Sequence, residues 1–334
     1  MVRRADNDYG CESPEIGLES LTFVGSGLKR PECVLTTAHG DLYAADWRGG
    51  VTHILPNGEH RLYHGRAPDG RELRPNGISL QADGSFLIAN LGTEQGGVFR
   101  LKRDGEVSVY LDRIDGIDLP PCNFVFSDYA GRTWITISTR KIPRAGAYRR
   151  NVSDGFIVMV DQKGARIVAD SLGYTNEAAI DPSGCWLYVN ETFGRCLSRF
   201  SIKGNGDLGQ REVVTEFGAG TFPDGLAFDA EGGAWVTSII SNRVIRVLPD
   251  GYQKLFLEDA DVDHVAWVES AFGENTLGRS HLDQVKSRCL KNISSLAFGG
   301  PDLHTAHLGC LLGESIGCLK LPFAGHPLPH WNYH

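Results

Sequence analysis

Six segments of the chain repeat one pattern, and each opens with a polar residue that could take part in chemistry. A short apolar run follows it, and in the first five segments a glycine stands eight residues later and an aromatic residue or Leu eleven residues later. The segments beginning PNGISLQADG and PDGLAFDAEG, at Pro75 and Pro223, are two examples. The aligned polar residues are Glu32, Asn76, Asn123, Asn176, Asp224 and Ser294. Carboxylate and amide oxygens without Cys or His suit a hard cation such as Ca²⁺, Mg²⁺ or Mn²⁺.

A local role for these polar residues is the alternative to a shared site. Asn, Asp and Ser are frequent in turns and at the starts of strands, where they make local hydrogen bonds. For any single segment that interpretation is the better one. Glu32 is a poor turn residue, however, and six polar residues in one register favour a site to which all of them contribute.

The spacing of the segments predicts the elements that must position these residues. The aligned residues lie 44, 47, 53, 48 and 70 positions apart, and the intervening stretches alternate apolar residues around Asn-Gly, Asp-Gly and Lys-Gly turns. Each unit therefore reads as about four short strands, and the repeat predicts an all-β, six-bladed β-propeller. A β-sandwich needs no such period, and an α/β fold needs alternating helices. Because the innermost strands of a propeller line its central channel, the aligned residues are expected to form a ring.

The last repeat interval is long enough to hold an insertion. Residues 260–291 place apolar residues at helical spacing, which predicts two short helices before the last blade. Packing against the rim and a lid over the channel mouth both stay open for them. We expect an N-terminal extension at residues 1–20 and a single propeller domain at 21–334.

Composition restricts the class of protein and its partners. The formal net charge of −8 argues against a nucleic-acid partner, because phosphate binding needs a basic surface. No apolar run approaches the roughly 18 residues of a membrane span, and the polar N-terminus lacks the apolar stretch of a secretion signal. The eight Cys residues contain no CxxC pair and are read as reduced thiols. A cytoplasmic protein that acts on a small molecule is expected, and its oligomeric state is left open.

The chain resembles the senescence marker protein-30 and gluconolactonase family of six-bladed propellers. The segments PDGLAFDAEGGAWV and AFGGPDL carry the resemblance, which extends over most of residues 28–331, and more distantly the chain is similar to diisopropyl fluorophosphatase and the paraoxonases. Family members hold one catalytic divalent cation with a Glu, two Asn and an Asp from four blades and hydrolyse lactones or related esters. The resemblance implies the metal ligands Glu32, Asn123, Asn176 and Asp224, with Asp224 also as the catalytic base. It favours Ca²⁺, with Mn²⁺, Mg²⁺ and Zn²⁺ as alternatives.

Departures from the family pattern bear on the substrate. Cys33 follows Glu32 where the family has Gly, and Pro121 stands where some members place an Arg that contacts sugar-acid lactones. Arg74 is a candidate replacement for that Arg, with a salt bridge at the rim as the alternative role. The other candidate substrate contacts are Asn76, Ser294 and Glu177, and Glu177 is also an outside candidate for activating water.

A metal-dependent lactonase is therefore the predicted function. Two alternatives stay open: different chemistry at the same metal site (a lyase, an isomerase or a phosphotriester hydrolase), and a non-catalytic propeller that binds a ligand. Fold alone does not fix the reaction.

Overall fold

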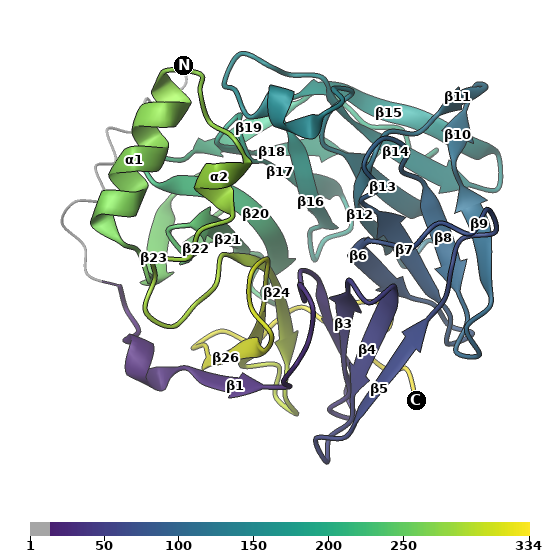
Figure 1. The fold of residues 1–334 in the computed structure, drawn as a ribbon, viewed down its shortest axis with the longest axis horizontal. Helices are drawn as coiled ribbons and strands as arrows, with labels where there is room; N and C mark the ends of the chain where they lie inside the picture. Colours follow the sequence, from purple (N-terminus) through teal and green to yellow (C-terminus); the bar gives the residue numbers. More distant parts are fainter. Residues whose placement is uncertain (1–13) are drawn as a thin grey trace.

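Six four-stranded antiparallel sheets surround a central axis in the computed structural model, which describes residues 14–334 (Figure 1). The predicted six-bladed propeller is confirmed. Blades 1 to 5 run along the chain from the innermost strand outward, as do the inner three strands of blade 6, and neighbouring innermost strands contact one another around the channel. None of the helices in residues 14–334 is long and apolar enough to cross a membrane.

The strands of the first three blades follow the chain in order. Blade 1 contains β2 (Val34–Thr36), β3 (Leu42–Asp46), β4 (Gly50–Ile54) and β5 (His60–His64). Blade 2 contains β6 (Pro75–Leu80), β7 (Phe86–Asn90), β8 (Val98–Leu101) and β9 (Val107–Leu111). A small hairpin, β10 (Arg113–Ile114) and β11 (Ile117–Asp118), leads to blade 3, which contains β12 (Cys122–Ser127), β13 (Thr133–Ile137), β14 (Gly155–Asp161) and β15 (Gly164–Leu172).

Blades 4 and 5 also follow the chain in order, whereas blade 6 takes strands from both ends of the described chain. Blade 4 contains β16 (Thr175–Ile180), β17 (Trp186–Glu191), β18 (Cys196–Ser201) and β19 (Glu212–Glu216). Blade 5 contains β20 (Thr221–Phe228), β21 (Ala234–Ile240), β22 (Arg243–Val247) and β23 (Gln253–Leu257). Blade 6 contains β24 (Ile293–Gly299), β25 (Thr305–Cys310), β26 (Ile316–Lys320) and, outermost, β1 (Thr22–Val24).

Part of the predicted N-terminal extension belongs to the propeller. After the short helix η1 (Leu18–Ser20), β1 pairs antiparallel with β26 and so joins the start of the described chain to the last blade. Before it, Ile16 donates its amide to the Phe256 carbonyl at 2.9 Å, and its side chain packs on the apolar core between blades 5 and 6. Residues 1–13 of the predicted extension lie outside the described part.

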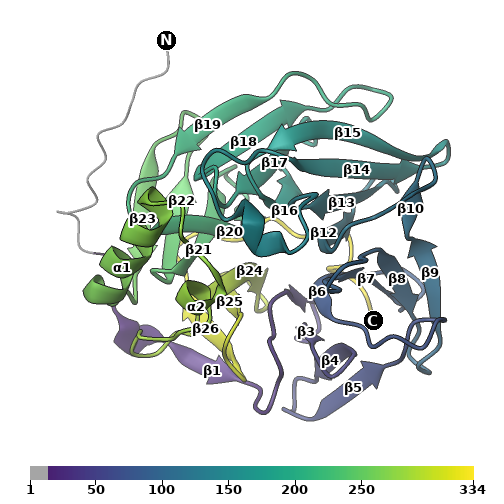
Figure 2. The same cartoon turned by 45° about the horizontal axis from the view of Figure 1, so that its top comes forward.

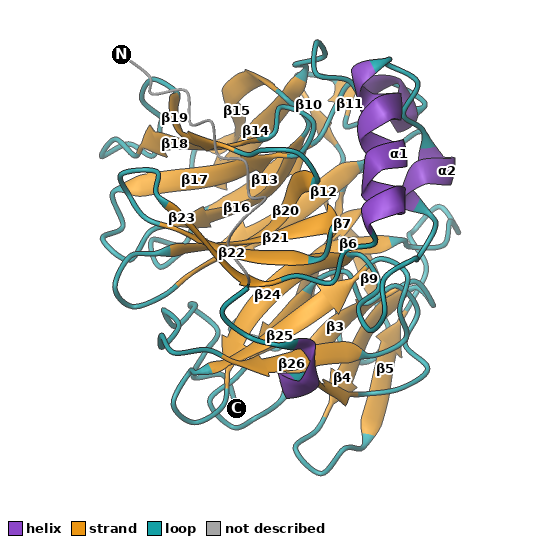
Figure 3. Ribbon diagram, turned by 90° about the vertical axis from the view of Figure 1, so that its left-hand side faces the viewer, coloured by secondary structure: helices purple, strands orange, loops and turns teal. Residues whose placement is uncertain are grey.

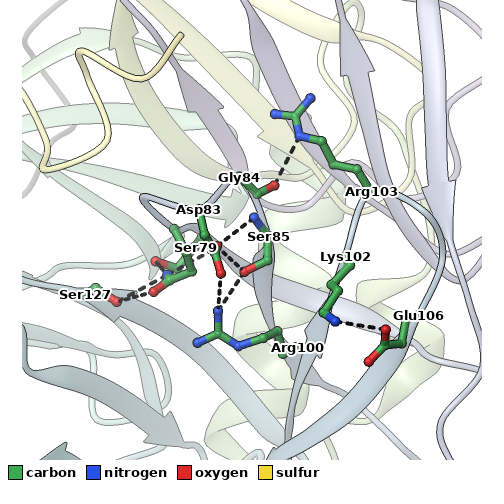
Figure 4. A network of polar contacts seen from close by, with 10 residues as sticks. Ser79, Asp83, Gly84, Ser85, Arg100, Lys102, Arg103, Glu106 and Ser127 are labelled. Carbon is green, nitrogen blue, oxygen red and sulfur yellow. Dashed lines mark hydrogen bonds and ion pairs between the residues drawn. The ribbon is translucent and has the colours of Figure 1, made fainter.

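The turns that end the innermost strands explain the glycine of the sequence repeat. In blade 2, Asp83 accepts hydrogen bonds from the Ser85 amide and hydroxyl at 3.0 and 2.6 Å and pairs with Arg100 at 3.1 Å (Figure 4). Gly84, between them, has a φ of 81°, a conformation that residues with a Cβ rarely adopt. The carboxylate closes the turn and the glycine lets the chain reverse, so the next strand starts at a fixed place.

The helical insertion before the last blade is also confirmed. Helix α1 (Val262–Gly273) begins after Asp261, whose side chain accepts the His264 amide at 2.7 Å, and α2 (Arg279–Leu282) follows. Figures 2 and 3 show both helices together on one side of the molecule, beside blades 5 and 6. The buried face of α1 packs on the aromatic residues of blades 4 and 5, with the Phe272 and Phe222 ring centres 5.4 Å apart.

Residues 326–331, near the C-terminus, lie across the end of the channel opposite α2. His326 donates its amide to the Phe228 carbonyl at 2.8 Å, Tyr129 donates its hydroxyl to the Pro327 carbonyl at 2.9 Å, and Ala38 donates its amide to the Trp331 carbonyl at 2.8 Å. These partners lie at or just after the ends of innermost strands in blades 5, 3 and 1. The segment therefore crosses the propeller on the side where those strands end, whereas α2 lies on the side where they begin.

Candidate active site

The ring residues occupy irregular positions in their strands. In blades 2 to 6 the pairing of the innermost strand with its neighbour shifts register at the aligned residue, as between Cys122 and Phe124 around Asn123. In blade 1, Glu32 comes two residues before β2 begins. Such β-bulges leave a residue outside the regular ladder and re-aim its side chain, and they are frequent beside active sites. The bulges turn successive polar side chains toward the channel.

Three amide oxygens at the ring are buried without a hydrogen-bond partner. They are Oδ1 of Asn76, Asn123 and Asn176, whose residues are 2 to 4% exposed. For two of them the amide nitrogen is satisfied by the protein: Asn76 donates to the Asn123 carbonyl, and Asn176 donates to the Thr192 hydroxyl, both at 2.9 Å. Because leaving a buried acceptor unpaired costs about 1–3 kcal/mol, three together indicate that a donor or a cation completes the site.

Two carboxylates complete the ring. Glu32 is held by Arg30, whose Nε and Nη2 lie 2.9 and 2.8 Å from Oε2, so Oε1 is left for another partner. Burial raises the pKa of the Asp224 carboxyl well above its usual value, and the charge of Glu32 raises it further, while Arg30 and Arg144 act in the opposite direction. An ionised Asp224 is therefore costly in this structure without further positive charge at the ring.

The donor set fits a hard divalent cation. Two carboxylates and three neutral amide oxygens match the all-oxygen coordination of Ca²⁺ and, with waters, of Mg²⁺ or Mn²⁺. In residues 14–334, no three His, Cys, Asp or Glu side chains form a group that could hold a metal ion. A metal site at the ring must therefore depend on the asparagines, which is the pattern that the sequence predicts.

The other predicted substrate contacts lie elsewhere. Ser294 is fully buried and donates its hydroxyl to the Glu32 carbonyl at 3.0 Å. Glu177 accepts the Leu226 amide at 2.9 Å and lines a cavity on the opposite side of the ring, which Phe124 and Leu226 also line. Arg74 is exposed, its guanidinium lying 5.2 Å from the Trp47 ring centre, and it does not line the pocket at the ring. The structure thus brings Asn76 together with the four predicted ligands. Ser294 adjoins Glu32 without lining the pocket, and Glu177 and Arg74 lie outside it.

The walls above the ring come from residues that the sequence pattern does not reveal. Three arginines line them: Arg30, which precedes blade 1, Arg144 on the short helix η2 (Arg144–Ala147) and Arg279 on α2. All three belong to connections outside the aligned segments, so no repeat marks them. Because α2 contributes Arg279 and Leu282 to the pocket, the insertion is more than packing at the rim.

The pocket above the ring is nearly filled by its own side chains. Its free volume is about 40 Å³, far below the roughly 300–1,000 Å³ of ordinary small-molecule sites. The wall is partly aromatic: Tyr148 and Tyr174 lie with ring centres 5.5 Å apart, and Arg144 lies 5.4 Å from the Tyr174 ring centre. A molecule larger than a few waters can enter only if side chains such as Arg144 and Arg279 move aside.

Comparisons with known proteins agree with this architecture. The sequence model of the SMP-30/Gluconolactonase/LRE-like region matches residues 75–258, more than half of the chain. A curated relative, 6-deoxy-6-sulfogluconolactonase from Pseudomonas putida, is 28% identical over 214 residues, which cover 63% of this chain and 68% of the relative.

Solved propellers show the same fold along almost the whole chain. A gluconolactonase from Xanthomonas campestris superposes with a TM-score of 0.65 at 18% identity, covering 90% of this chain and 89% of its own. A calcium-binding protein, regucalcin, from Agrobacterium tumefaciens gives 0.65 at 17% identity, covering 93% and 98%. At these identities the structural likeness shows the fold alone.

Proposed function

The chain belongs to the SMP-30/gluconolactonase/LRE-like family, and we propose that it hydrolyses the ester bond of a lactone at the ring. The single observation that carries the proposal is the set of three buried, unpaired amide oxygens beside Glu32 and Asp224. The names of the relative and of the structural neighbour, a sulfogluconolactonase and a gluconolactonase, support a lactone as the substrate.

The proposed metal ligands are Glu32, Asn123, Asn176 and Asp224, and the Asn76 oxygen faces the same pocket. Ca²⁺ is the proposed cation, because an all-oxygen set with several neutral carbonyl-type donors suits its flexible coordination. A divalent cation held there would supply a Lewis acid that polarises the ester carbonyl.

Residues of the chain account for the remaining chemistry. Asp224 accepts a proton from the water that attacks the ester carbon, the role of a general base. The C–O bond of the lactone then breaks, and the departing alkoxide oxygen takes up that proton from Asp224 to give the hydroxy acid. Arg30 holds Glu32 in one orientation, so that carboxylate keeps its place while Asp224 exchanges its proton.

Asp224→Asn tests the proposal with a matched control. The panel would contain sugar, aliphatic and aromatic lactones, and proton release would be followed at constant pH with Ca²⁺ present. We expect the wild-type protein to hydrolyse at least one lactone and Asp224→Asn to be slower by about 100-fold or more, as removal of a catalytic base implies. Asp104→Asn, at an exposed turn, should leave the rate unchanged. A wild-type protein that hydrolyses no lactone, or an Asp224→Asn protein as fast as the control, would overturn the proposal.

A further inference from the structure

Arg144 places a guanidinium beside the pocket, where its charge acts to lower the pKa of the Asp224 carboxyl. Its Nη2 donates to the Ser138 hydroxyl at 3.0 Å, while its Nε is buried and has no hydrogen-bond partner. In the part of the chain that the structure describes, no carboxylate lies within ion-pair distance of it. The other two arginines of the pocket differ: Arg30 pairs with Glu32, and Arg279 pairs with Asp283.

The position of Arg144 points its charge at the pocket. Helix η2 leaves blade 3 after β13, yet the Arg144 side chain reaches the Tyr174 ring of blade 4 and lines the pocket together with Asp224 of blade 5. The contact with the Tyr174 ring and the bond to Ser138 fix its direction. Arg279 reaches the same pocket from α2, so guanidinium groups from two separate elements face one space.

Arg144 is half-buried, and a partly desolvated guanidinium without an ion-pair partner gains free energy when an anion binds beside it. Arginine is also the residue best suited to hold a carboxylate, phosphate or sulfonate through two parallel hydrogen bonds. A neutral lactone has no group that would need this charge away from its ester.

We propose that Arg144, assisted by Arg279, binds an anionic substituent of the substrate, so that the preferred lactones carry a carboxylate, phosphate or sulfonate group away from the ester. The inference rests on the proposed lactone hydrolysis. It gives to Arg144 a role for which the sequence offered Arg74 as one candidate.

The test compares Arg144→Gln with Arg140→Gln, a control on the same connection. Arg140 is exposed and pairs with Asp170 at 2.7 Å, so its loss removes one positive charge without touching the pocket. KM and kcat would be measured on glucono-1,5-lactone and on its analogues that carry a phosphate, a sulfonate or a carboxylate at C6. For anionic lactones we expect Arg144→Gln to raise KM by about 10- to 100-fold, as the loss of a charge-assisted hydrogen bond implies. KM for the neutral lactone should change less than about twofold, and Arg140→Gln should match the wild type.

A binding measurement separates failure of this inference from failure of the proposed function. Calorimetric titration with 6-phosphogluconate, which has no lactone bond to hydrolyse, reports anion recognition without turnover. Weakening of this binding by Arg144→Gln but not by Arg140→Gln supports the inference even if no lactone is hydrolysed. Equal losses for neutral and anionic lactones, or 6-phosphogluconate binding that does not depend on Arg144, would overturn it. The anionic lactone whose KM rises most in Arg144→Gln identifies the preferred anion.

Discussion

The effect of Asp224→Asn on the free energy of unfolding should change sign when Ca²⁺ is added. In the metal-free protein Asp224 is a buried carboxyl beside Glu32, and burial together with that like charge raises its pKa. Replacing it with the neutral, isosteric Asn removes this repulsion. Relief of a strained functional site commonly stabilises a protein by about 0.5–2 kcal/mol, so we expect a gain of about 1 kcal/mol in EDTA at pH 7.5.

Added Ca²⁺ should favour the wild type instead. A ligand at 100 times its dissociation constant stabilises the folded state by about 2.7 kcal/mol. If the substitution weakens binding 100-fold, the same Ca²⁺ concentration stabilises Asp224→Asn by only about 0.4 kcal/mol. With Ca²⁺ the wild type is then more stable than the variant by about 1 kcal/mol, which reverses the order of the two proteins in EDTA.

Chemical denaturation with and without Ca²⁺ measures both differences, and Asp104→Asn controls for the loss of a surface charge. An Asp224→Asn protein that is less stable than wild type in EDTA would show that the carboxylate is not repelled at the ring. An equal Ca²⁺-induced gain in both proteins would show that the ion binds elsewhere. Either result would contradict the predicted reversal of stability.

Three further predictions concern the scaffold. Glu269→Ala should lower the free energy of unfolding by about 3–5 kcal/mol in denaturant titrations, because it leaves the buried Arg195 guanidinium, 2.6 Å from Glu269, without its partner. Burial lowers the pKa of His307 to about 4, so the unfolded chain binds a proton more readily below pH 6.5. About 3 kcal/mol of stability should be lost between pH 6.5 and 4, and His307→Gln should remove that component of the pH dependence of unfolding. Gly225→Ala should cost about 1–3 kcal/mol in thermal unfolding, because the added Cβ would lie 2.5 Å from the Ser295 Cα.

Each of these predictions has a control in the same chain. Glu274→Ala removes an exposed carboxylate of the insertion, His60→Gln an exposed imidazole, and Gly204→Ala adds a Cβ that meets nothing within 4 Å. An effect no larger than that of the control would contradict the corresponding prediction. For His307 the contradiction is an unchanged slope of stability against pH.

The fold was predictable because each blade repeats the same pattern of residues along the sequence. The spacing of the aligned residues and the glycine of each turn, as at Gly84, follow from strands that must reverse at fixed places. The number of blades and the helices before the last blade followed as well. The closure of blade 6 by β1 was not predicted, because strand pairing between distant segments leaves no local pattern.

The candidate site was predictable only in part. The register of Asn76, Asn123 and Asn176 could be read from the repeat, although the β-bulges that turn them inward could not, because a bulge depends on how two strands pair. Arg144 and Arg279 come from connections that differ from blade to blade, so no repetition marks them.

The decisive experiment follows the metal content of the protein together with its lactone hydrolysis. The protein would be stripped with EDTA, and Ca²⁺, Mn²⁺, Mg²⁺ or Zn²⁺ would be restored in steps while bound metal and proton release are both recorded. We expect turnover to vanish with EDTA and to return in proportion to one bound cation per chain, and we expect Asp224→Asn to bind that cation much more weakly. Full turnover in the metal-free protein, or a cation bound equally well by Asp224→Asn, would contradict this expectation.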